Sequence, residues 1–379
     1  MGRWRRLAGH ATAGGFDGSN GLLVSGENIQ RERLPLLVTG LPGLPGYNSF
    51  HYLRHRYGDG VIGLKPRHTR ALDYGGVYAI NAEDRADFQA LFERYRFRTV
   101  IDASGCCALK SCEFNPQLAE LINVDFGHRI AQQARQYGAR LIRFSTDLVF
   151  DGGGSGQYCE EDPVCPITVY GQTMARAETA ILAAHPEAVL LRLPLPMGPS
   201  LNGHAGAIDW IGHRFSHGNA ATLYYDEIRS NIYIQDVLAV IEFFLRQEHS
   251  GIFHLGGPLP LSLYEIGQIV NKVGDYPPAL LKGCWRRQAA PLPPRVGDVS
   301  MDMGKLYGLL PPGTIRAWPL AVDFRPTDRD WHLRRDQPVA EGAIGAELYG
   351  YNWDKEARHP LRWHGNPAYI DHTEDTGAN

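Results

Sequence analysis

The chain has 379 residues, of which 44% are hydrophobic and 21% are charged, and its formal net charge is −3. These values are typical of a soluble globular enzyme with one large α/β domain and a smaller companion. The slightly acidic balance argues against a nucleic-acid partner, which calls for a basic face. No run approaches the roughly 20 apolar residues of a membrane span.

Residues 1–33 contain several glycines and show no sustained hydrophobic periodicity, so we predict a flexible leader. The Arg5-Arg6 pair is not followed by the apolar stretch of an export signal. The sequence therefore favours a cytoplasmic protein.

Cysteines are few and have neither a CxxC pattern nor zinc-ligand spacing, so we predict no metal site. They are Cys106, Cys107, Cys112, Cys159, Cys165 and Cys284. The adjacent pair Cys106-Cys107 is interpreted as two small buried or half-buried residues rather than a redox centre.

The first predicted strand, residues 34–39, runs directly into Gly40, Gly43 and Gly46, and a helix-length segment follows. Between a first strand and a first helix, a G-x-x-G-x-x-G pattern predicts a loop that lets a dinucleotide pyrophosphate approach the helix N-terminus. An ordinary turn is the alternative, and the two prolines within the loop each remove an N–H that could face phosphate.

A second predicted strand, residues 60–64, ends at Lys65, and Arg67 and Arg70 follow. NAD-binding proteins place an acid near this point, whereas NADP-binding proteins place basic groups there. No acid lies between Val61 and Arg70, so the sequence favours NADP(H) over NAD(H). A solvated, positively charged loop is the alternative.

The following segments continue to alternate between strand and helix. We predict strands at 76–80, 99–104, 141–144, 188–193 and 251–257, and helices at 84–96, from 115, from near 170, and after a capping-box pattern at Ser262 and Glu265. This alternation predicts an α/β fold with a Rossmann-type doubly wound parallel sheet.

Residues 144–178 carry the candidate chemistry. Ser145, Thr146 and Asp147 end a buried strand, where open parallel sheets collect their active sites, and Tyr170 lies near the start of the next helix. A hydroxyl facing a tyrosine is what a carbonyl-reducing site needs, because one group polarises the carbonyl and the other delivers a proton.

The run Ser145-Thr146-Asp147-Leu148-Val149-Phe150-Asp151-Gly152, followed by Tyr170-Gly171-Gln172-Thr173-Met174, resembles the active-site segment of dTDP-4-dehydrorhamnose reductases. These belong to the nucleotide-sugar branch of the extended short-chain dehydrogenase/reductases. The resemblance covers residues 34–324. It implies a cofactor core at about 34–195, a smaller C-terminal substrate-binding lobe mostly within 196–324, and a separate extension at 325–379.

The resemblance also implies the site residues. Thr146 and Tyr170 would be catalytic, and the tyrosine would donate a proton to the carbonyl oxygen as hydride arrives. The implied cofactor-binding residues are Gly40, Gly43, Gly46, Lys65, Arg67, Asn81, Ala103 and Ser104, where Asn81 takes the place of the family's usual aspartate. Asn123 falls on the family's structural asparagine.

Met174 departs from the family pattern, which has a lysine here that holds the cofactor ribose and lowers the pKa of the tyrosine. Losing two to three pKa units of such assistance would cost about 3–4 kcal/mol, or some hundreds-fold in rate. Arg176 faces elsewhere on the helix, and the direction of Arg143 cannot be fixed from the sequence.

Three functional hypotheses therefore remain open. The chain could be an NADP(H)-dependent reductase of a 4-keto nucleotide-sugar, or an epimerase-like relative, with an atypical site. It could be a catalytically degenerate member that binds dinucleotide or nucleotide-sugar as a binding or regulatory subunit. It could also be a structural oligomerisation partner.

The tail, residues 325–379, has weak periodicity but includes Trp331, Trp353 and Trp363. It could be disordered, or it could pack as an arm against a second subunit in a homodimer. Its histidines are His332, His359, His364 and His372, and their spacing fits no common metal-ligand pattern.

Overall fold

The computed structural model describes residues 31–350, except 74, 204, 336–338 and 340–343. The predicted leader up to residue 30 and the tail positions Trp353, His359, Trp363, His364 and His372 lie outside the described residues. Among the helices that are described, none is both long and apolar enough to cross a membrane.

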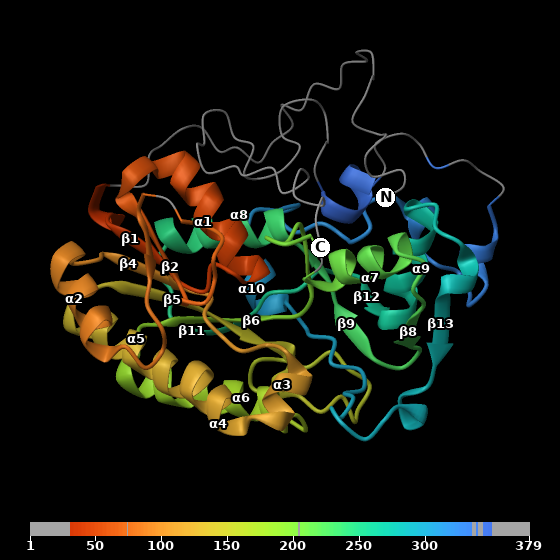
Figure 1. The fold of residues 1–379 in the computed structure, drawn as a ribbon, viewed down its shortest axis with the longest axis horizontal. Coiled ribbons are helices and arrows are strands. Elements are labelled where there is room, and N and C mark those ends of the chain that lie inside the picture. The colour runs from red at the N-terminus through yellow and green to blue at the C-terminus, as the bar shows by residue number, and fades with distance from the viewer. Residues whose placement is uncertain (1–30, 74, 204, 336–338, 340–343, 351–379) are drawn as a thin grey trace, which may run out of the picture.

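A seven-stranded sheet forms the centre of the larger part of the molecule (Figure 1). All its strands are parallel, in the order β11-β6-β5-β4-β1-β2-β3. They are β1 (Leu36–Val38), β2 (Val61–Lys65), β3 (Val77–Ala79), β4 (Thr99–Asp102), β5 (Arg140–Thr146), β6 (Val189–Leu193) and β11 (Gly251–His254). The strand order reverses between β1 and β4, so a crevice is expected outside the carboxyl ends of these two strands. The predicted Rossmann-type fold is confirmed.

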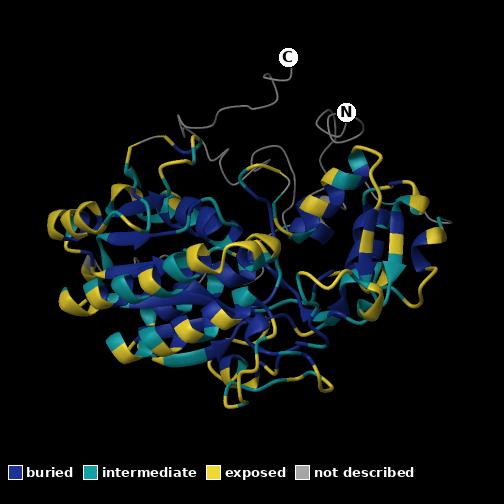
Figure 2. Cartoon of the chain, turned by 60° about the horizontal axis from the view of Figure 1, so that its bottom comes forward, coloured by how far each residue is buried: buried dark blue, intermediate teal, exposed yellow. Residues whose placement is uncertain are grey.

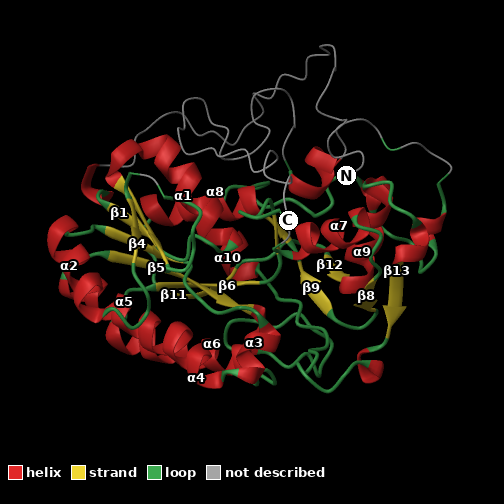
Figure 3. Cartoon of the chain, viewed as in Figure 1, coloured by secondary structure: helices red, strands yellow, loops and turns green. Residues whose placement is uncertain are grey.

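Helices cover both faces of this sheet, as Figure 3 shows. On one face lie α1 (Leu44–Tyr57), α8 (Ile234–Arg246) and α10 (Gly304–Tyr307), and on the other lie α2 (Arg85–Tyr95), α3 (Leu109–Phe114), α4 (Pro116–Glu120), α5 (Phe126–Gln136) and α6 (Val169–Ala184). Leu36 and Val38 enter the core under α1 and α8, while Leu37 enters the core under α2 and α5. Because strand side chains alternate between faces, a strand buried on both sides becomes a continuous apolar run.

The smaller lobe is built from three two-stranded pairings and has its own buried core (Figure 2). Its elements are β7 (Pro196–Met197), α7 (Ala207–Ser216), β8 (Ala221–Tyr224), β9 (Ile228–Ser230), β10 (Ile232–Tyr233), β12 (Pro260–Ser262), α9 (Leu263–Val273) and β13 (Leu281–Cys284). The predicted capping box opens α9. Ser262 Oγ accepts from the Glu265 N–H at 3.2 Å, and the Ser262 N–H donates to Glu265 Oε2 at 2.7 Å.

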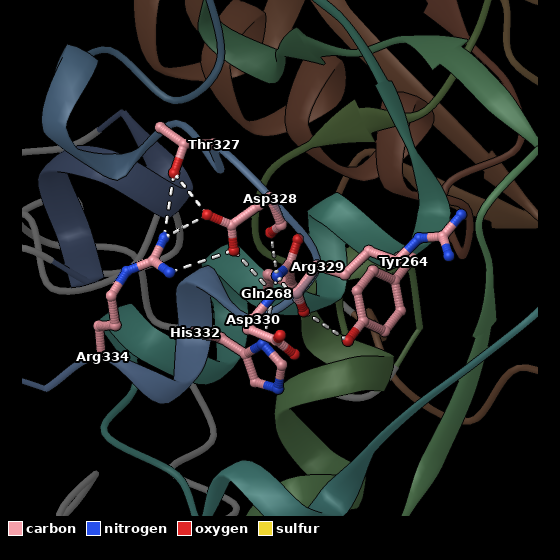
Figure 4. A network of polar contacts seen from close by, with 8 residues as sticks. All are labelled: Tyr264, Gln268, Thr327, Asp328, Arg329, Asp330, His332 and Arg334. Atoms are coloured by element: carbon pink, nitrogen blue, oxygen red, sulfur yellow. Dashed lines mark hydrogen bonds and ion pairs between the residues drawn. The ribbon is translucent and has the colours of Figure 1, made fainter.

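The described residues beyond 324 pack against this lobe. The Tyr264 hydroxyl donates to the Arg329 carbonyl at 3.0 Å, and Gln268 Nε2 donates to the carbonyls of Asp328 and Arg329, both at 3.0 Å (Figure 4). Trp331, Leu348 and Tyr349 are buried in the lobe's core. The first part of the predicted extension therefore completes the lobe within one chain.

Candidate active site

The glycine loop between β1 and α1 lies against the end of β4. Gly40 has φ +66°, and a Cβ on it would lie 2.1 Å from the Ala103 carbonyl oxygen. A Cβ on Gly46 would lie 2.2 Å from the Gly40 carbonyl oxygen, whereas the nearest atom to one on Gly43 is 3.4 Å away. Gly40 and Gly46 are therefore required for packing, while Gly43 leaves one side of the loop open.

The open side of the loop fits a dinucleotide pyrophosphate. Gly43 caps α1, and the first turn of a helix leaves its N–H groups without partners inside the helix. Leu44 and Gly46 can direct such N–H groups at an anion, although Pro45 cannot. The predicted residues Ala103 and Ser104 lie directly beside this loop.

Asp102, at the end of β4, is a buried carboxylate that the sequence prediction missed. It accepts hydrogen bonds from Thr39 Oγ1 and Ser104 Oγ, both at 2.6 Å, and pairs with Arg143. Arg143 is only 1% exposed and also donates to Ser104 Oγ at 2.9 Å. Its side chain therefore points towards the end of β4. The available signal was a charged residue in each of two neighbouring apolar strands, Asp102 at the end of β4 and Arg143 in the middle of β5.

The predicted catalytic pair comes together at the start of α6. Thr168 Oγ1 accepts from the Gly171 N–H at 3.0 Å, which fixes the helix start one residue before Tyr170. A Cβ on Gly171 would lie 2.1 Å from the Leu148 carbonyl oxygen, so only glycine lets the helix approach the turn after Thr146 this closely. Thr146 lies close enough to Tyr170 to lower the pKa of its phenol, while the Thr146 hydroxyl donates to Asp147 Oδ1 and accepts from the Leu148 N–H, both at 3.2 Å.

The electrostatic environment keeps Tyr170 protonated. Desolvation raises the pKa of Tyr170 above its ordinary value, whereas neighbouring Thr146 and the positive charge of Arg143 lower it by less. Arg143 pairs with Asp102, so much of its charge is compensated locally. Tyr170 is thus a neutral proton donor and a poor base at neutral pH.

Met174, one turn beyond Tyr170, is 3% exposed. It belongs to an apolar cluster with Leu148, Val149, Phe150, Val296, Val299, Met301 and Met303, against which Tyr170 also packs. Arg176 turns away and pairs with Glu120 on α4. The environment of Met174 is therefore apolar.

Two of the predicted basic residues, Lys65 at the end of β2 and Arg67 after it, are engaged by other groups. Lys65 is 3% exposed, donates to the carbonyls of Thr69 and Ala71, both at 2.8 Å, and pairs with Asp73. Arg67 is exposed and pairs with Asp84 at 2.8 Å and Asp87 at 2.5 Å.

Asn81, at the end of β3, holds the same loop, because its Oδ1 accepts from the Arg67 N–H at 2.9 Å. Asp84 directly precedes α2 and Asp87 lies in its first turn, so the sequence from Val61 to Arg70 could not reveal these partners of Arg67.

Arg229, on β9, links the two parts of the molecule through a buried ion pair. Its guanidinium donates to both carboxylate oxygens of Asp147 at 2.5 Å. Glu227 lies 3.9 Å away on the other side. The residue after Thr146 is therefore fixed to the smaller lobe, a contact that no local sequence pattern indicates.

No three His, Cys, Asp or Glu side chains gather as metal ligands within the part of the chain that the structure describes. Tyr170 with Thr146 and the glycine loop are thus the features that carry the candidate chemistry.

The sequence profile of the RmlD substrate binding domain matches residues 35–318. The methionine adenosyltransferase 2 subunit beta of Xenopus laevis is 28% identical over 305 residues, which cover 77% of this chain and 86% of the relative. A dTDP-4-dehydrorhamnose reductase of Streptomyces griseus is 33% identical over 151 residues, 40% of this chain and 46% of the relative.

Among solved structures, the dTDP-4-dehydrorhamnose reductase of Bacillus anthracis in complex with NADP has a TM-score of 0.61. Its sequence is 18% identical, and the match covers 73% of this chain and 92% of that chain. At this identity the likeness concerns the fold.

Proposed function

Because this chain belongs to the RmlD substrate binding domain family, we propose that it is an NADP(H)-dependent reductase of a 4-keto nucleotide-sugar with an atypical active site. The observation that carries the proposal is the placement of Thr146 at the end of β5 beside Tyr170 in the first turn of α6, with the glycine loop packed against the end of the neighbouring strand β4.

Each residue has a distinct role in this proposal. The loop of Gly40, Gly43 and Gly46 and the first turn of α1 hold the dinucleotide, which supplies the hydride when bound. Thr146 orients the substrate carbonyl, and Tyr170 donates a proton to the oxygen as it gains charge. The raised pKa of Tyr170 keeps the phenol in the neutral form that can donate a proton, but it also makes the phenol a weaker acid.

The second candidate is a dinucleotide- or nucleotide-sugar-binding regulatory subunit. Two observations favour it: Met174 lies in an apolar cluster, and desolvation outweighs the groups that would make Tyr170 a stronger acid. In addition, one of the relatives that match most of this chain is the beta subunit of a methionine adenosyltransferase.

Substitution of Tyr170 tests the reductase proposal. The full chain should bind NADPH and reduce a 4-keto nucleotide-sugar, which loss of NADPH absorbance measures. Tyr170→Phe should lower the rate by about 100-fold or more, the usual contribution of a general acid, while NADPH binding remains. Tyr158→Phe is the matched control, since Tyr158 stacks on Phe150 in the same apolar cluster. NADPH binding without turnover of any keto-sugar would support the regulatory subunit instead.

Met174→Lys tests whether the atypical position limits the rate. The methylene stem of lysine can replace the methionine side chain, and an ammonium one turn beyond Tyr170 would lower the pKa of the phenol. We expect at least about a tenfold faster reduction, equivalent to one pKa unit, and tighter NADPH binding. Met174→Leu keeps the site apolar and should show neither gain. If the wild type is already active and Met174→Lys is no faster, another positive group, such as Arg143, already lowers the pKa of the Tyr170 phenol.

A further inference from the structure

Two thiols approach each other in the loop between β4 and α3, beside the candidate active site. The Sγ atoms of Cys106 and Cys112 lie 3.6 Å apart, and Cys112 Sγ also donates to the Cys106 carbonyl at 3.1 Å. Cys112 is buried on α3, whereas Cys106 is half-buried in the loop and can meet a small solute.

The pair is polarised for thiol chemistry. The hydrogen bond from Cys112 lowers the pKa of Cys106 to about 6, and the same hydrogen bond raises the pKa of Cys112. Cys106 is therefore the accessible thiolate, and Cys112 keeps its proton. A low-pKa, accessible thiolate next to a second cysteine is the usual arrangement of a redox-sensitive site.

We propose that Cys106 and Cys112 form a reversible disulfide when the protein meets a hydroperoxide. The Cys106 thiolate attacks one peroxide oxygen, the O–O bond breaks, and a sulfenic acid and hydroxide form. Cys112 then attacks the sulfenic sulfur, the S–O bond breaks, and the departing hydroxide takes the Cys112 proton as water. Two thiols lose two electrons in all, and the peroxide gains them. This modification goes beyond the proposed reductase activity and does not depend on it.

Asn123 connects the two cysteines to the candidate active site, so disulfide formation would alter the contacts that position α6. A disulfide needs an S–S distance of about 2.0 Å, so the two sulfurs must move together from 3.6 Å. The Cys106 N–H donates to Asn123 Oδ1 at 2.7 Å, and Asn123 Nδ2 donates to Thr173 Oγ1 at 2.8 Å. Thr173 lies on α6 three residues after Tyr170, so movement of the Cys106 loop strains the contact that holds this helix.

Peptide mapping tests the disulfide directly. The full chain is treated with hydrogen peroxide, remaining thiols are blocked with N-ethylmaleimide, and the protein is digested with trypsin. Lys110 lies between the two cysteines, so cleavage separates peptide 99–110 from peptide 111–129. We expect the linked pair of peptides to rise by about tenfold or more after peroxide treatment and to disappear with dithiothreitol.

Three variants identify the partners. Cys107→Ser should still form the linked peptides, because Cys107 is exposed and outside the pair. Cys106→Ser and Cys112→Ser should each abolish them. A link that persists in Cys106→Ser would assign the bond to Cys107, and no link in the wild type after peroxide would overturn the proposal.

The oxidised and reduced proteins can also be compared by NADPH titration, where we expect a several-fold weaker affinity after oxidation. This arm rests on the proposed function. Failure of both forms to bind NADPH would count against the reductase, whereas equal affinity of both forms would overturn the coupling between the disulfide and the site.

Discussion

At the scale of single residues, the ion pair of Asp147 with Arg229 joins the end of strand β5 to the smaller lobe. Both side chains are buried, so removing one leaves an uncompensated charge. Arg229→Ala should lower the free energy of unfolding by about 3–5 kcal/mol, as measured by urea denaturation. Arg295→Ala is the control, because Arg295 is more exposed and lies 3.9 Å from Glu227. An equal decrease in the free energy of unfolding in the two variants would show that the ion pair with Asp147 contributes no more than the exposed contact of Arg295.

Arg67 is an exposed basic group after β2 that a 2′-phosphate could recruit. If it does, the wild type should bind NADPH more tightly than NADH, and Arg67→Ala should narrow the difference several-fold. Asp87→Asn, which removes a competing carboxylate from Arg67, should widen it. Fluorescence titration with both cofactors measures the ratio. Equal affinity of the wild type for NADPH and NADH would contradict the NADP(H) preference.

The protonation state of Tyr170 predicts a pH dependence. Because its pKa lies above the ordinary value of 10.0, the phenol stays protonated at neutral and mildly alkaline pH. Any fall in the reduction rate below pH 10 should therefore not come from Tyr170. The reverse oxidation needs the phenolate and should rise steadily towards pH 10. The assignment would be contradicted if the reduction rate fell with rising pH at an apparent pKa near 7 and this fall were missing in the Tyr170→Phe variant.

At the scale of elements, different glycines of the loop from β1 to α1 serve packing and cofactor binding. Gly40→Ala should destabilise the fold by about 1–3 kcal/mol or more, because a left-handed non-glycine residue is strained and its Cβ would clash with the Ala103 carbonyl. Gly43→Ala has room within the protein but fills the side that a pyrophosphate would approach. It should keep the melting temperature and weaken NADPH binding. If both variants lose only stability, the loop is a structural turn.

Local patterns predicted the elements, and long-range contacts account for what the sequence could not show. The strand ending at Thr146 and the helix carrying Tyr170 follow from an apolar run and from helix signals in neighbouring residues. The environments of Lys65 and Arg67 depend on a loop fold and on carboxylates from α2. The direction of Arg143 depends on Asp102, 41 positions earlier in the chain. A single sequence specifies such pairings only once the fold brings the strands together.

At the scale of the whole molecule, the profile match ends at residue 318, but the lobe's core continues. Trp318 Nε1 donates to the Leu348 carbonyl at 3.1 Å, and the Tyr233 hydroxyl donates to the Glu347 carbonyl at 2.7 Å. Tyr349 reaches Asp209 on α7 at 2.5 Å. The described residues between 325 and 350 therefore close the lobe from the outside, with Trp331 packed beneath Lys272 of α9.

Two truncations test this closure. A chain ending at residue 324 loses Trp331, Leu348 and Tyr349, which are large buried hydrophobic side chains among the described residues. It should be destabilised by more than about 3 kcal/mol, the cost of removing even one such side chain from a core. A chain ending at residue 350 keeps these side chains and should be more stable than the chain ending at residue 324. Removing residues 1–33 is a matched control at the other end, since among the described residues it breaks only the exposed ion pair of Arg33 with Glu248, worth at most about 1 kcal/mol. Thermal denaturation of the three truncated chains ranks them by melting temperature. If the chain ending at 324 melts with the other two, the segment rests on the lobe without contributing to its stability.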